Sequence, residues 1–541
     1  MKYGFVIDNR KCIGCHACTT ACKSEHDTPI GVNRTYVKQV EKGEFPHTRR
    51  LFSVMRCNHC TDAPCVEICP VESLFFRDDG IVDFDKDRCI GCKSCMQACP
   101  YDALYIDPNS HTAAKCNYCA HRIDVGLEPA CVNVCPEHAI ISGDMEDPDS
   151  EITQLLSRNQ VTVRKASKGT EPNLFYIDGD EASLNPSATD KSDQYFWNSQ
   201  SLGVGHYAKA AEKMAFSNGD VIQAALEINQ QHINTEELNK DGHAKSIDIL
   251  MGKARRIYDT PDKGILWGWE VSGYVVTKAI SAGAILVPIL AILFGWAQPA
   301  GQTLDWSIGL GIAFLGVTGL LLVIDLDRPD RFLNVLLRPQ WGSWLVRGAY
   351  IITAYGGLLA LWAVMRFLNI QTGQTALYIG LGLAALMTAI YTAFLFAQAK
   401  GRDFWQSPTL AIHMLVHSFM AGAATFLILS AFLGEAVSWV SYLKNVLLIG
   451  TVINLLTLVA EIVTPHPTVD AKRTIKMIIK GRYRNQFWLG AILLGNLLPM
   501  AGLIAGLEAT WALPVIGLLS ILGIYFTEKI WVEAPQRIPL A

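Results

Sequence analysis

The chain has 541 residues, half of them hydrophobic, and a formal net charge of -4. It is too long for one compact domain and too apolar for an ordinary soluble protein. The small net charge gives no indication of nucleic-acid binding. Before about residue 265 the chain is polar, and after it come uncharged runs of about 20 residues, the length that crosses a bilayer.

All sixteen cysteines lie near the N-terminus and fall into four groups of four. The groups are Cys12, Cys15, Cys18 and Cys22; Cys57, Cys60, Cys65 and Cys69; Cys89, Cys92, Cys95 and Cys99; and Cys116, Cys119, Cys131 and Cys135. The third group has the spacing C-x2-C-x2-C-x3-C-P, closed by Pro100, which is the bacterial ferredoxin motif for a 4Fe-4S cluster. The second and fourth groups stretch the middle spacing, and the first has Lys23 where the proline would stand.

Two other uses of cysteine fit this pattern less well. A disulfide framework needs an oxidising compartment, and the opening residues MKYGFVIDNRKC have no signal-peptide pattern. Zinc sites use C-x2-C pairs, but a C-x2-C-x2-C-x3-C run offers one thiolate more than zinc places comfortably. Sixteen ligands match four 4Fe-4S clusters with no cysteine left over.

Residues 1–178 are predicted to form an α+β tandem ferredoxin-like iron-sulfur domain. Short strands such as GFVID and GIVDF lead into the cysteine loops. Residues 3–175, including GDMEDPDSEITQLLSRNQ after the last cysteine, resemble the four-cluster electron-transfer subunits of molybdopterin enzymes such as dimethyl sulfoxide, polysulfide and formate oxidoreductases.

In that family the first and fourth cysteine groups exchange their last ligands, as do the second and third. The resemblance therefore implies four ligand sets, each with three cysteines from one group and one from another. The sets are Cys12, Cys15, Cys18 and Cys135; Cys116, Cys119, Cys131 and Cys22; Cys57, Cys60, Cys65 and Cys99; and Cys89, Cys92, Cys95 and Cys69.

Residues 179–264 are predicted to be a polar linker followed by a helical spacer. Residues 180–205 are rich in Ser, Asn, Asp and Gly, which favours a loop. Residues 206–257 have helical periodicity and end in the basic sequence KARR. A solvated spacer is favoured over a docking site for a partner.

Residues 265–541 are predicted to form an all-α transmembrane bundle of eight helices. Each hydrophobic run is long enough to span lipid, and glycine and alanine recur within the runs, as close helix packing requires. The expected spans are about 269–296, 304–324, 343–365, 375–398, 409–433, 442–463, 487–507 and 509–530.

Basic residues are distributed unequally between the two sides of this bundle. Seventeen Lys and Arg residues lie in the connections and flanks on the side of the iron-sulfur domain, against Arg366 and Lys444 on the other side. The positive-inside rule then places the iron-sulfur domain and both termini in the cytoplasm, at the inner membrane of a prokaryote.

The membrane half also resembles a known family. The sequences WGWEVSGYVVTKAISAG at 267–283 and DLDRPDRFLNVLLRPQWGSWLVRG at 325–348 are similar to the NrfD-like quinone-reactive membrane subunits, which include the polysulfide reductase anchor. The resemblance implies that the bundle exchanges electrons with a membrane quinone, either menaquinone or ubiquinone.

Ionisable side chains within membrane spans are costly and therefore mark functional candidates. Those of this chain fall in the half of the bundle nearer the iron-sulfur domain, so we expect them to converge on a quinone-binding or proton-relay site. The candidates are Glu270, Tyr274, Lys278, Asp325, Arg347, His413, His417 and Glu461.

Several of these residues also have structural interpretations. Glu270 and Asp325 could mark helix ends, Lys278 could extend to the headgroups, and Arg347 could pair with Asp325. His413 and His417 project from one face of one helix, and no other predicted span contains a histidine. Haem held by two histidines is therefore not expected.

The two halves together predict a four-cluster electron-transfer domain fused to a quinone-reactive membrane anchor. Electrons would pass between a large cytoplasmic catalytic subunit, expected to be molybdopterin-dependent, and membrane quinone. Catalysis on the partner's substrate is not expected in this chain, which has no G-x-G-x-x-G in a strand-helix setting and no P-loop. A hydrogenase-linked or an ion-translocating quinone-dependent complex is the alternative.

Overall fold

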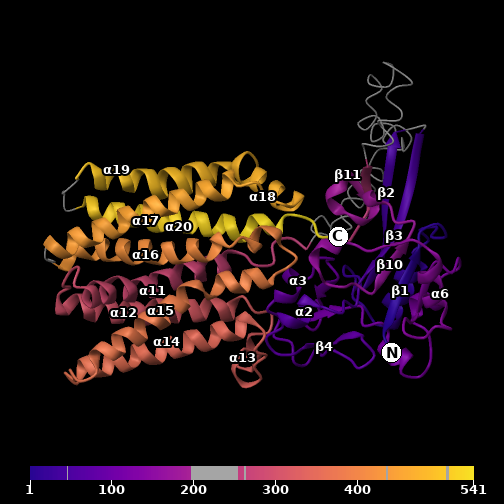
Figure 1. Ribbon diagram of the computed structural model, residues 1–541, viewed down its shortest axis with the longest axis horizontal. Helices are drawn as coiled ribbons and strands as arrows, with labels where there is room; N and C mark the ends of the chain where they lie inside the picture. The colour runs from indigo at the N-terminus through magenta and orange to yellow at the C-terminus, as the bar shows by residue number, and fades with distance from the viewer. Residues whose placement is uncertain (45–46, 197–253, 261–262, 434–436, 507–510) are drawn as a thin grey trace, which may run out of the picture.

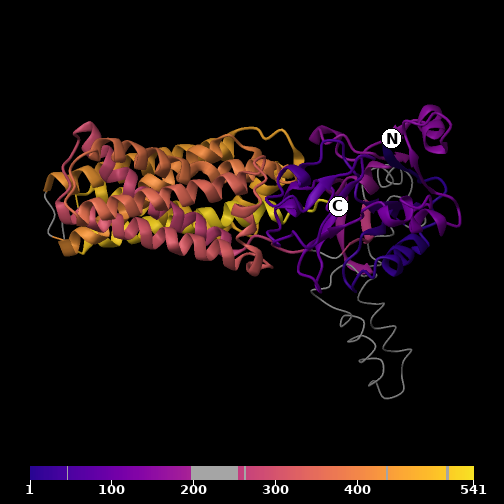
Figure 2. The ribbon, with the colours of Figure 1, turned by 90° about the horizontal axis from the view of Figure 1, so that it is seen from below.

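The computed structural model describes residues 1–44, 47–196, 254–260, 263–433, 437–506 and 511–541. The molecule is elongated, with a bundle of long helices at one end and the cysteine-rich domain at the other (Figure 1). The two parts also lie end to end in the perpendicular view (Figure 2). The α+β domain followed by an all-α bundle confirms the predicted fold class.

The cysteine-rich domain contains two four-stranded sheets, with strand orders β8-β1-β10-β9 and β11-β12-β2-β3, and two hairpins, β4-β5 and β6-β7. Its strands are β1 (Tyr3–Asp8), β2 (Thr35–Glu44), β3 (His47–Arg56), β4 (Leu74–Phe76), β5 (Val82–Phe84), β6 (Leu104–Ile106), β7 (Ala113–Lys115), β8 (Ile140–Asp144), β9 (Val161–Thr162), β10 (Leu174–Ile177), β11 (Asp190–Phe196) and β12 (Ala254–Tyr258). Its helices are α1 (Ala17–Glu25), α2 (Pro64–Glu67), α3 (Ser94–Ala98), α4 (Ala120–Ile123), α5 (Ala130–Asn133), α6 (Glu151–Arg158) and α7 (Glu181–Leu184).

The structure differs from the sequence prediction at both ends of the expected linker. Strand β11 pairs in parallel with β12, and β12 pairs antiparallel with β2, where Arg256 faces Val40. These polar strands obtain their hydrogen bonds from the sheet, so tertiary pairing outweighs their loop-like or helical local pattern. The remaining part of the predicted helical spacer, residues 197–253, lies outside the described residues.

The eight predicted spans are confirmed as helices that are long and apolar enough to cross a membrane. They are α11 (Trp269–Phe294), α12 (Gly301–Ile324), α14 (Trp344–Phe367), α15 (Gln374–Gln398), α16 (Thr409–Leu433), α17 (Val437–Val463), the pair of the π-helix Gln486–Leu497 and α19 (Leu498–Ile504), and α20 (Ala512–Gln536). The shorter α-helices α13 (Asn334–Leu337) and α18 (Val469–Ile479) lie between spans.

Helix α11 lies at the centre of the bundle and packs against α12, α15, α16 and α20. Its crossing with α16 depends on two glycines, because a Cβ on Gly283 would lie 2.0 Å from the backbone oxygen of Ser418 and 2.7 Å from the nitrogen of Gly422. Small residues allow this close backbone approach in helices that pack within lipid.

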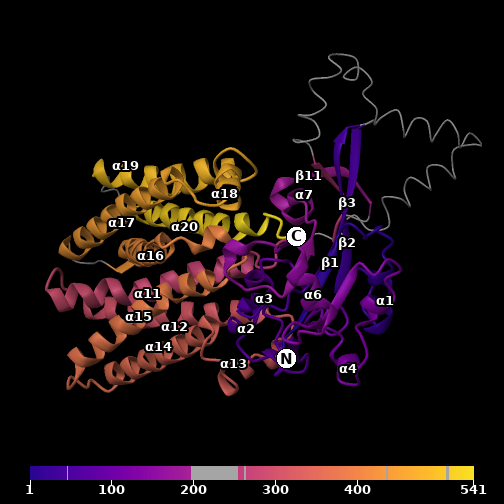
Figure 3. The ribbon, with the colours of Figure 1, turned by 45° about the vertical axis from the view of Figure 1, so that its right-hand side comes forward.

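The two halves of the molecule interlock. Helices α2 and α3 lie at the junction (Figure 3), and the loop after α12 reaches the third cysteine group, where the nitrogen of Asp327 donates to the oxygen of Gly91 at 3.3 Å. The segment after α20 returns into the cysteine-rich domain, where Arg164 Nη2 donates to the backbone oxygen of Leu540 at 3.2 Å. Leu540 and Ala541 are buried there.

Candidate functional site

The structure brings the cysteines together in sets that mix the groups of the sequence. All sixteen are free of disulfide bonds. One small cavity is lined by Cys12, Cys15, Cys18 and Cys135, and a second by Cys57, Cys60, Cys65 and Cys99. The other two sets are close enough to interact electrostatically. They are Cys22 with Cys116, Cys119 and Cys131, and Cys69 with Cys89, Cys92 and Cys95. These sets have the composition that the resemblance implies, and the binding of one cluster by each set stays a prediction.

The cysteine loops have the backbone geometry that such ligands need. Gly14 and Gly91, in the sequence C-I-G-C, adopt φ values of 69° and 70°, the left-handed region that favours glycine. Backbone N–H groups point at several sulfurs, as when the nitrogen of Ala113 donates to Cys89 Sγ at 3.3 Å. Such hydrogen bonds favour negative charge on the sulfur and tune a bound metal centre.

The buried side chain of Arg56 places a positive charge beside the cysteine sulfurs. Burial raises the pKa of the Cys18 thiol to about 12, and Arg56 acts against that rise. Arg56 Nη1 donates to Cys131 Sγ at 3.1 Å, while its Nε and Nη2 have no hydrogen-bond partner within the part of the chain that the structure describes. Unpaired donors beside clustered thiols fit a bound anionic iron-sulfur group.

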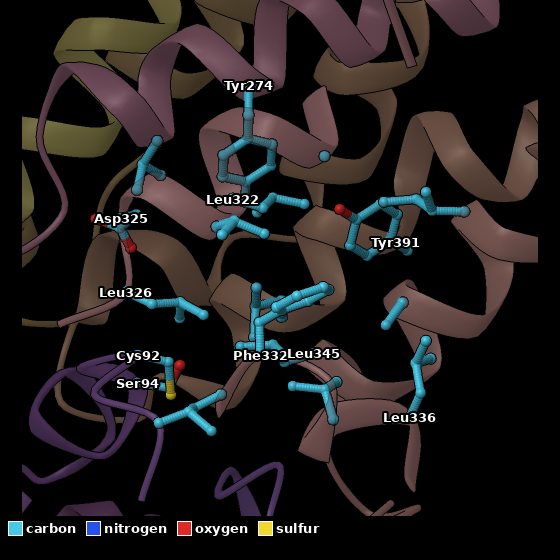
Figure 4. Close-up of a pocket in the computed structure, with 18 of the residues that line it drawn as sticks. Cys92, Ser94, Tyr274, Leu322, Asp325, Leu326, Phe332, Leu336, Leu345 and Tyr391 are labelled. Atoms are coloured by element: carbon cyan, nitrogen blue, oxygen red, sulfur yellow. The ribbon is translucent and has the colours of Figure 1, made fainter. Parts of the chain in front are cut away.

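A largely apolar cavity of about 240 Å³ lies where the cysteine-rich domain meets the bundle. We call it the junction cavity. It is lined by Cys92 and Ser94 of the cysteine-rich domain and by side chains of α11, α12, α14 and α15. Figure 4 shows Tyr274 and Cys92 on opposite sides of it, with Asp325 at one edge.

Tyr274 and Asp325 are the two predicted candidates that line the junction cavity. Burial raises the pKa of Asp325, one residue past the end of α12, to about 7, and Lys93 acts against that rise. Lys278 lies one helical turn beyond Tyr274, where its Nζ donates to Thr392 Oγ1 at 2.6 Å. That nitrogen lies 4.8 Å from the ring centre of Tyr391, which also lines the cavity.

Two other candidates do not line this cavity. Glu270 lies in the first turn of α11 and is partly exposed. Arg347 Nε donates to the backbone oxygen of Trp341 at 2.8 Å, and its guanidinium lies over the ring of Trp344. Arg347 therefore does not pair with Asp325, whose cationic neighbour is Lys93.

His413 and His417 form a separate buried group with Glu528 of α20. The Nδ1 atom of His417 lies 2.6 Å from Glu528 Oε1, and Nε2 of His413 lies 3.5 Å from the same oxygen. All three residues are at most 3% exposed. On the neighbouring helices, Asn454 Nδ2 donates to Asn496 Oδ1 at 3.0 Å.

Glu461 occupies a third position, at the wall of a more polar cavity of about 580 Å³. Its Oε2 accepts hydrogen bonds from Ser407 Oγ at 2.9 Å and from Thr409 Oγ1. The ion pair between Lys168 and Asp403 lines the same cavity. The eight candidates therefore do not converge on one site.

Comparison with known proteins agrees with this division into two halves. A family model described as polysulphide reductase NrfD matches residues 260–532, which is half of the chain. The chain belongs to the NrfD family. Two models described as 4Fe-4S dicluster domains match residues 5–70 and 48–145, so an iron-sulfur electron-transfer domain is fused to the NrfD domain.

Curated relatives match the iron-sulfur half. A tetrathionate reductase subunit of Salmonella typhimurium is 44% identical over 189 residues, 34% of this chain and 76% of the relative. A polysulfide reductase chain of Wolinella succinogenes is 42% identical over 179 residues, 32% of this chain and 94% of the relative. The arsenate respiratory reductase iron-sulfur subunit of a Shewanella species is 33% identical over 225 residues, 33% of this chain and 96% of the relative.

Sequence reasoning missed two residues of the NrfD domain that the structure places beside the candidates. Tyr391 lines the junction cavity, but it lies in the fourth span, outside the two stretches that carry the resemblance to the NrfD-like subunits. Glu528 is fully buried against His417. An acidic residue within a predicted span was a usable signal, but Lys529 follows it directly and makes the segment resemble a helix end.

Proposed function

We propose that this protein passes electrons between a catalytic subunit and membrane quinone, and that quinone reacts in the junction cavity. One observation carries the proposal: Cys92, a predicted cluster ligand, lines the same cavity as Tyr274 and Asp325. An electron donor, a titratable carboxyl group and apolar walls are the three features that a quinone site needs.

Four 4Fe-4S clusters, which carry one electron at a time, would be held by the four mixed sets of cysteines described above. Backbone conformation and N–H groups of this chain suit these positions to cluster binding. Positive φ values at Gly14 and Gly91 let the loops turn tightly, and N–H groups such as that of Ala113 stabilise sulfur charge. Burial of most of the sixteen cysteines excludes water from the sites.

The junction cavity supplies the groups for two-electron, two-proton chemistry on a quinone substrate. Its apolar lining suits the ring and the hydrocarbon tail. The Asp325 carboxyl, with a pKa raised to about 7 by burial, can hold or release a proton near neutral pH. Tyr274 also lines the cavity, and its hydroxyl is a group that can donate a hydrogen bond to a quinone oxygen.

The relatives named as parts of reductases support a large catalytic partner, which we propose to be molybdopterin-dependent. The excess of Lys and Arg on the side of the iron-sulfur domain supports a cytoplasmic position for that domain and for the partner. We expect elemental analysis of the complex, extracted in mild detergent, to find molybdenum or tungsten together with about sixteen irons per chain. Nickel in its place would favour the hydrogenase-linked alternative.

Two glycines of α12 provide a direct test of the quinone site. Gly319 lines the junction cavity, whereas Gly316 does not, and a Cβ at either position meets nothing within 4 Å. Gly319→Phe should fill the cavity and slow oxidation of the dithionite-reduced protein by a short-chain quinone about tenfold or more, a loss of at least about 1.4 kcal/mol. Gly316→Phe should react like the wild type, and equal rates in all three proteins would refute the proposed site.

A second function, ion translocation, is favoured by the buried His413 group. Three ionisable side chains in contact within the bundle, away from the junction cavity, are costly unless they serve a purpose. Turnover in sealed vesicles should then build a membrane potential. An electroneutral reaction would remove this function and leave the first intact.

A further inference from the structure

A basic residue directly precedes the first cysteine of each of the four groups. These residues are Lys11, Arg56, Arg88 and Lys115. The structure separates them into two pairs. Arg56 and Lys115 are 2% and 0% exposed, whereas Lys11 is exposed and the Arg88 side chain is 46% exposed beside Asp85. The same sequence position therefore places two cations in water and two among buried sulfurs.

Arg56 is held without a carboxylate partner. Its Nη1 donates to Cys131 Sγ at 3.1 Å, and its guanidinium lies 4.4 Å from the ring centre of Phe5. Within the described residues it forms no ion pair with a carboxylate, and two of its nitrogens lack any hydrogen-bond acceptor. A buried cation in this state is strongly unfavourable unless negative charge lies beside it.

Lys115 is the second buried cation, and it directly precedes Cys116, the first cysteine of the fourth group. Its Nζ donates to the backbone oxygens of Val82 and, at 2.9 Å, Cys116. Val82 lines the small cavity formed by Cys57, Cys60, Cys65 and Cys99, so the Lys115 ammonium group lies beside that set. The arrangement is reciprocal. Arg56 precedes Cys57 but contacts Cys131, while Lys115 precedes Cys116 but also donates to Val82, which lines the cavity of the Cys57 set.

We propose that Arg56 and Lys115 are redox-tuning residues, which raise the reduction potentials of the clusters expected on the Cys116 and Cys57 sets. This inference rests on the proposed four-cluster function. Each cluster gains one negative charge when it accepts one electron, and a fixed positive charge in a buried, poorly screened position stabilises the reduced form. Lys11 and Arg88 are screened by water and salt, so their effect is small.

The test is a dithionite redox titration of the full-length protein in detergent, followed by electron paramagnetic resonance. Arg56→Gln and Lys115→Gln should each move the midpoint potential of one cluster to more negative values, and the two variants should affect different clusters. Arg56→Lys, which keeps the charge, should move it much less. Lys11→Gln and Arg88→Gln are the matched controls, with potentials equal to those of the wild type.

The outcomes separate this inference from the function on which it rests. Wild-type protein without iron would overturn the four-cluster assignment. Variants with full iron content and unchanged midpoint potentials would overturn only the tuning role. Equal shifts of the midpoint potential in Arg56→Lys and Arg56→Gln would also overturn it, because the charge of Arg56 would then not be the cause. If Arg56→Gln does not load iron, Arg56→Met, of similar length and without a polar group, is titrated in its place against the same prediction.

Discussion

Lys93 and Asp325 connect the two halves of the molecule at the edge of the junction cavity. Lys93 Nζ donates to the backbone oxygen of Asp325 at 2.8 Å and lies 3.7 Å from its Oδ1. Lys93 directly follows Cys92 in the chain. A residue next to a predicted cluster ligand thus holds the carboxyl group that we propose for proton exchange with quinone.

The rate of quinone reduction should depend on the protonation of Asp325. Burial raises the pKa of its carboxyl to about 7, with Glu270 and Asp327 adding to the effect and Lys93 opposing it. The carboxyl is therefore protonated below about pH 7 and ionised above it. Because the protonated form is the donor, the rate should be highest below pH 7 and fall as pH rises through that value.

Asp325→Asn should lower this rate about a hundredfold, the typical contribution of a positioned acid, and should remove the fall near pH 7. Asp327→Asn is the comparison variant, because Asp327 does not line the cavity. The fall with pH should remain in this variant but move to lower pH, since Asp327 contributes to the raised pKa of Asp325. A pH profile that is unchanged in Asp325→Asn would show that another group donates the proton.

The exchange of ligands between cysteine groups predicts which substitutions act alike. Cys69→Ser and Cys89→Ser should abolish the same cluster signal, because Cys69 lies in range of Cys89, Cys92 and Cys95. Cys99→Ser should affect a different signal, since Cys99 lines the cavity of the Cys57 set. Electron paramagnetic resonance with iron analysis decides this, and identical spectra of Cys89→Ser and Cys99→Ser would contradict the exchange.

Packing at the crossing of α11 and α16 should not tolerate a side chain at Gly283. A methyl group there would meet the backbone oxygen of Ser418 at 2.0 Å. Gly283→Ala should therefore lower the free energy of unfolding by about 3 kcal/mol, seen as a lower thermal midpoint in detergent. Gly380→Ala, at a position with nothing within 4 Å, should leave the midpoint equal or slightly higher.

Removal of Glu528 should destabilise the bundle even if no ion is translocated. His417 Nδ1 and Glu528 Oε1 are 2.6 Å apart and fully buried. Glu528→Leu leaves the histidine nitrogen without this partner, at a cost of about 1 to 3 kcal/mol. Glu528→Gln keeps a hydrogen-bonding group and should be milder. Equal thermal midpoints of the two variants would show that the contact contributes little.

The cysteine sites and the membrane spans could be predicted because both signals are local. Ligand spacing such as that from Cys89 to Cys99 is a property of a short loop, and a span is a continuous apolar run. The grouping of ionisable residues could not be predicted in the same way. It depends on how each helix is rotated about its axis, which separates Asp325 from His417 although both lie towards the same end of the bundle.

The sequence also could not predict which basic side chains are buried. Lys11, Arg56, Arg88 and Lys115 occupy the same place relative to their cysteines, and only the tertiary structure shows which two are enclosed. Strand β12 is a similar case, because its pairing partner β2 lies more than 200 residues earlier in the chain. Contacts of such long sequence separation leave no local pattern.

The return of the segment after α20 into the iron-sulfur domain constrains the order of biosynthesis. A ribosome completes residues 1–178 long before it makes Leu540, whose backbone oxygen accepts a hydrogen bond from the buried Arg164. The N-terminal domain therefore gains this contact only after the eighth helix has been synthesised. Maturation of the iron-sulfur domain is in this way tied to the synthesis of the last helix of the other half.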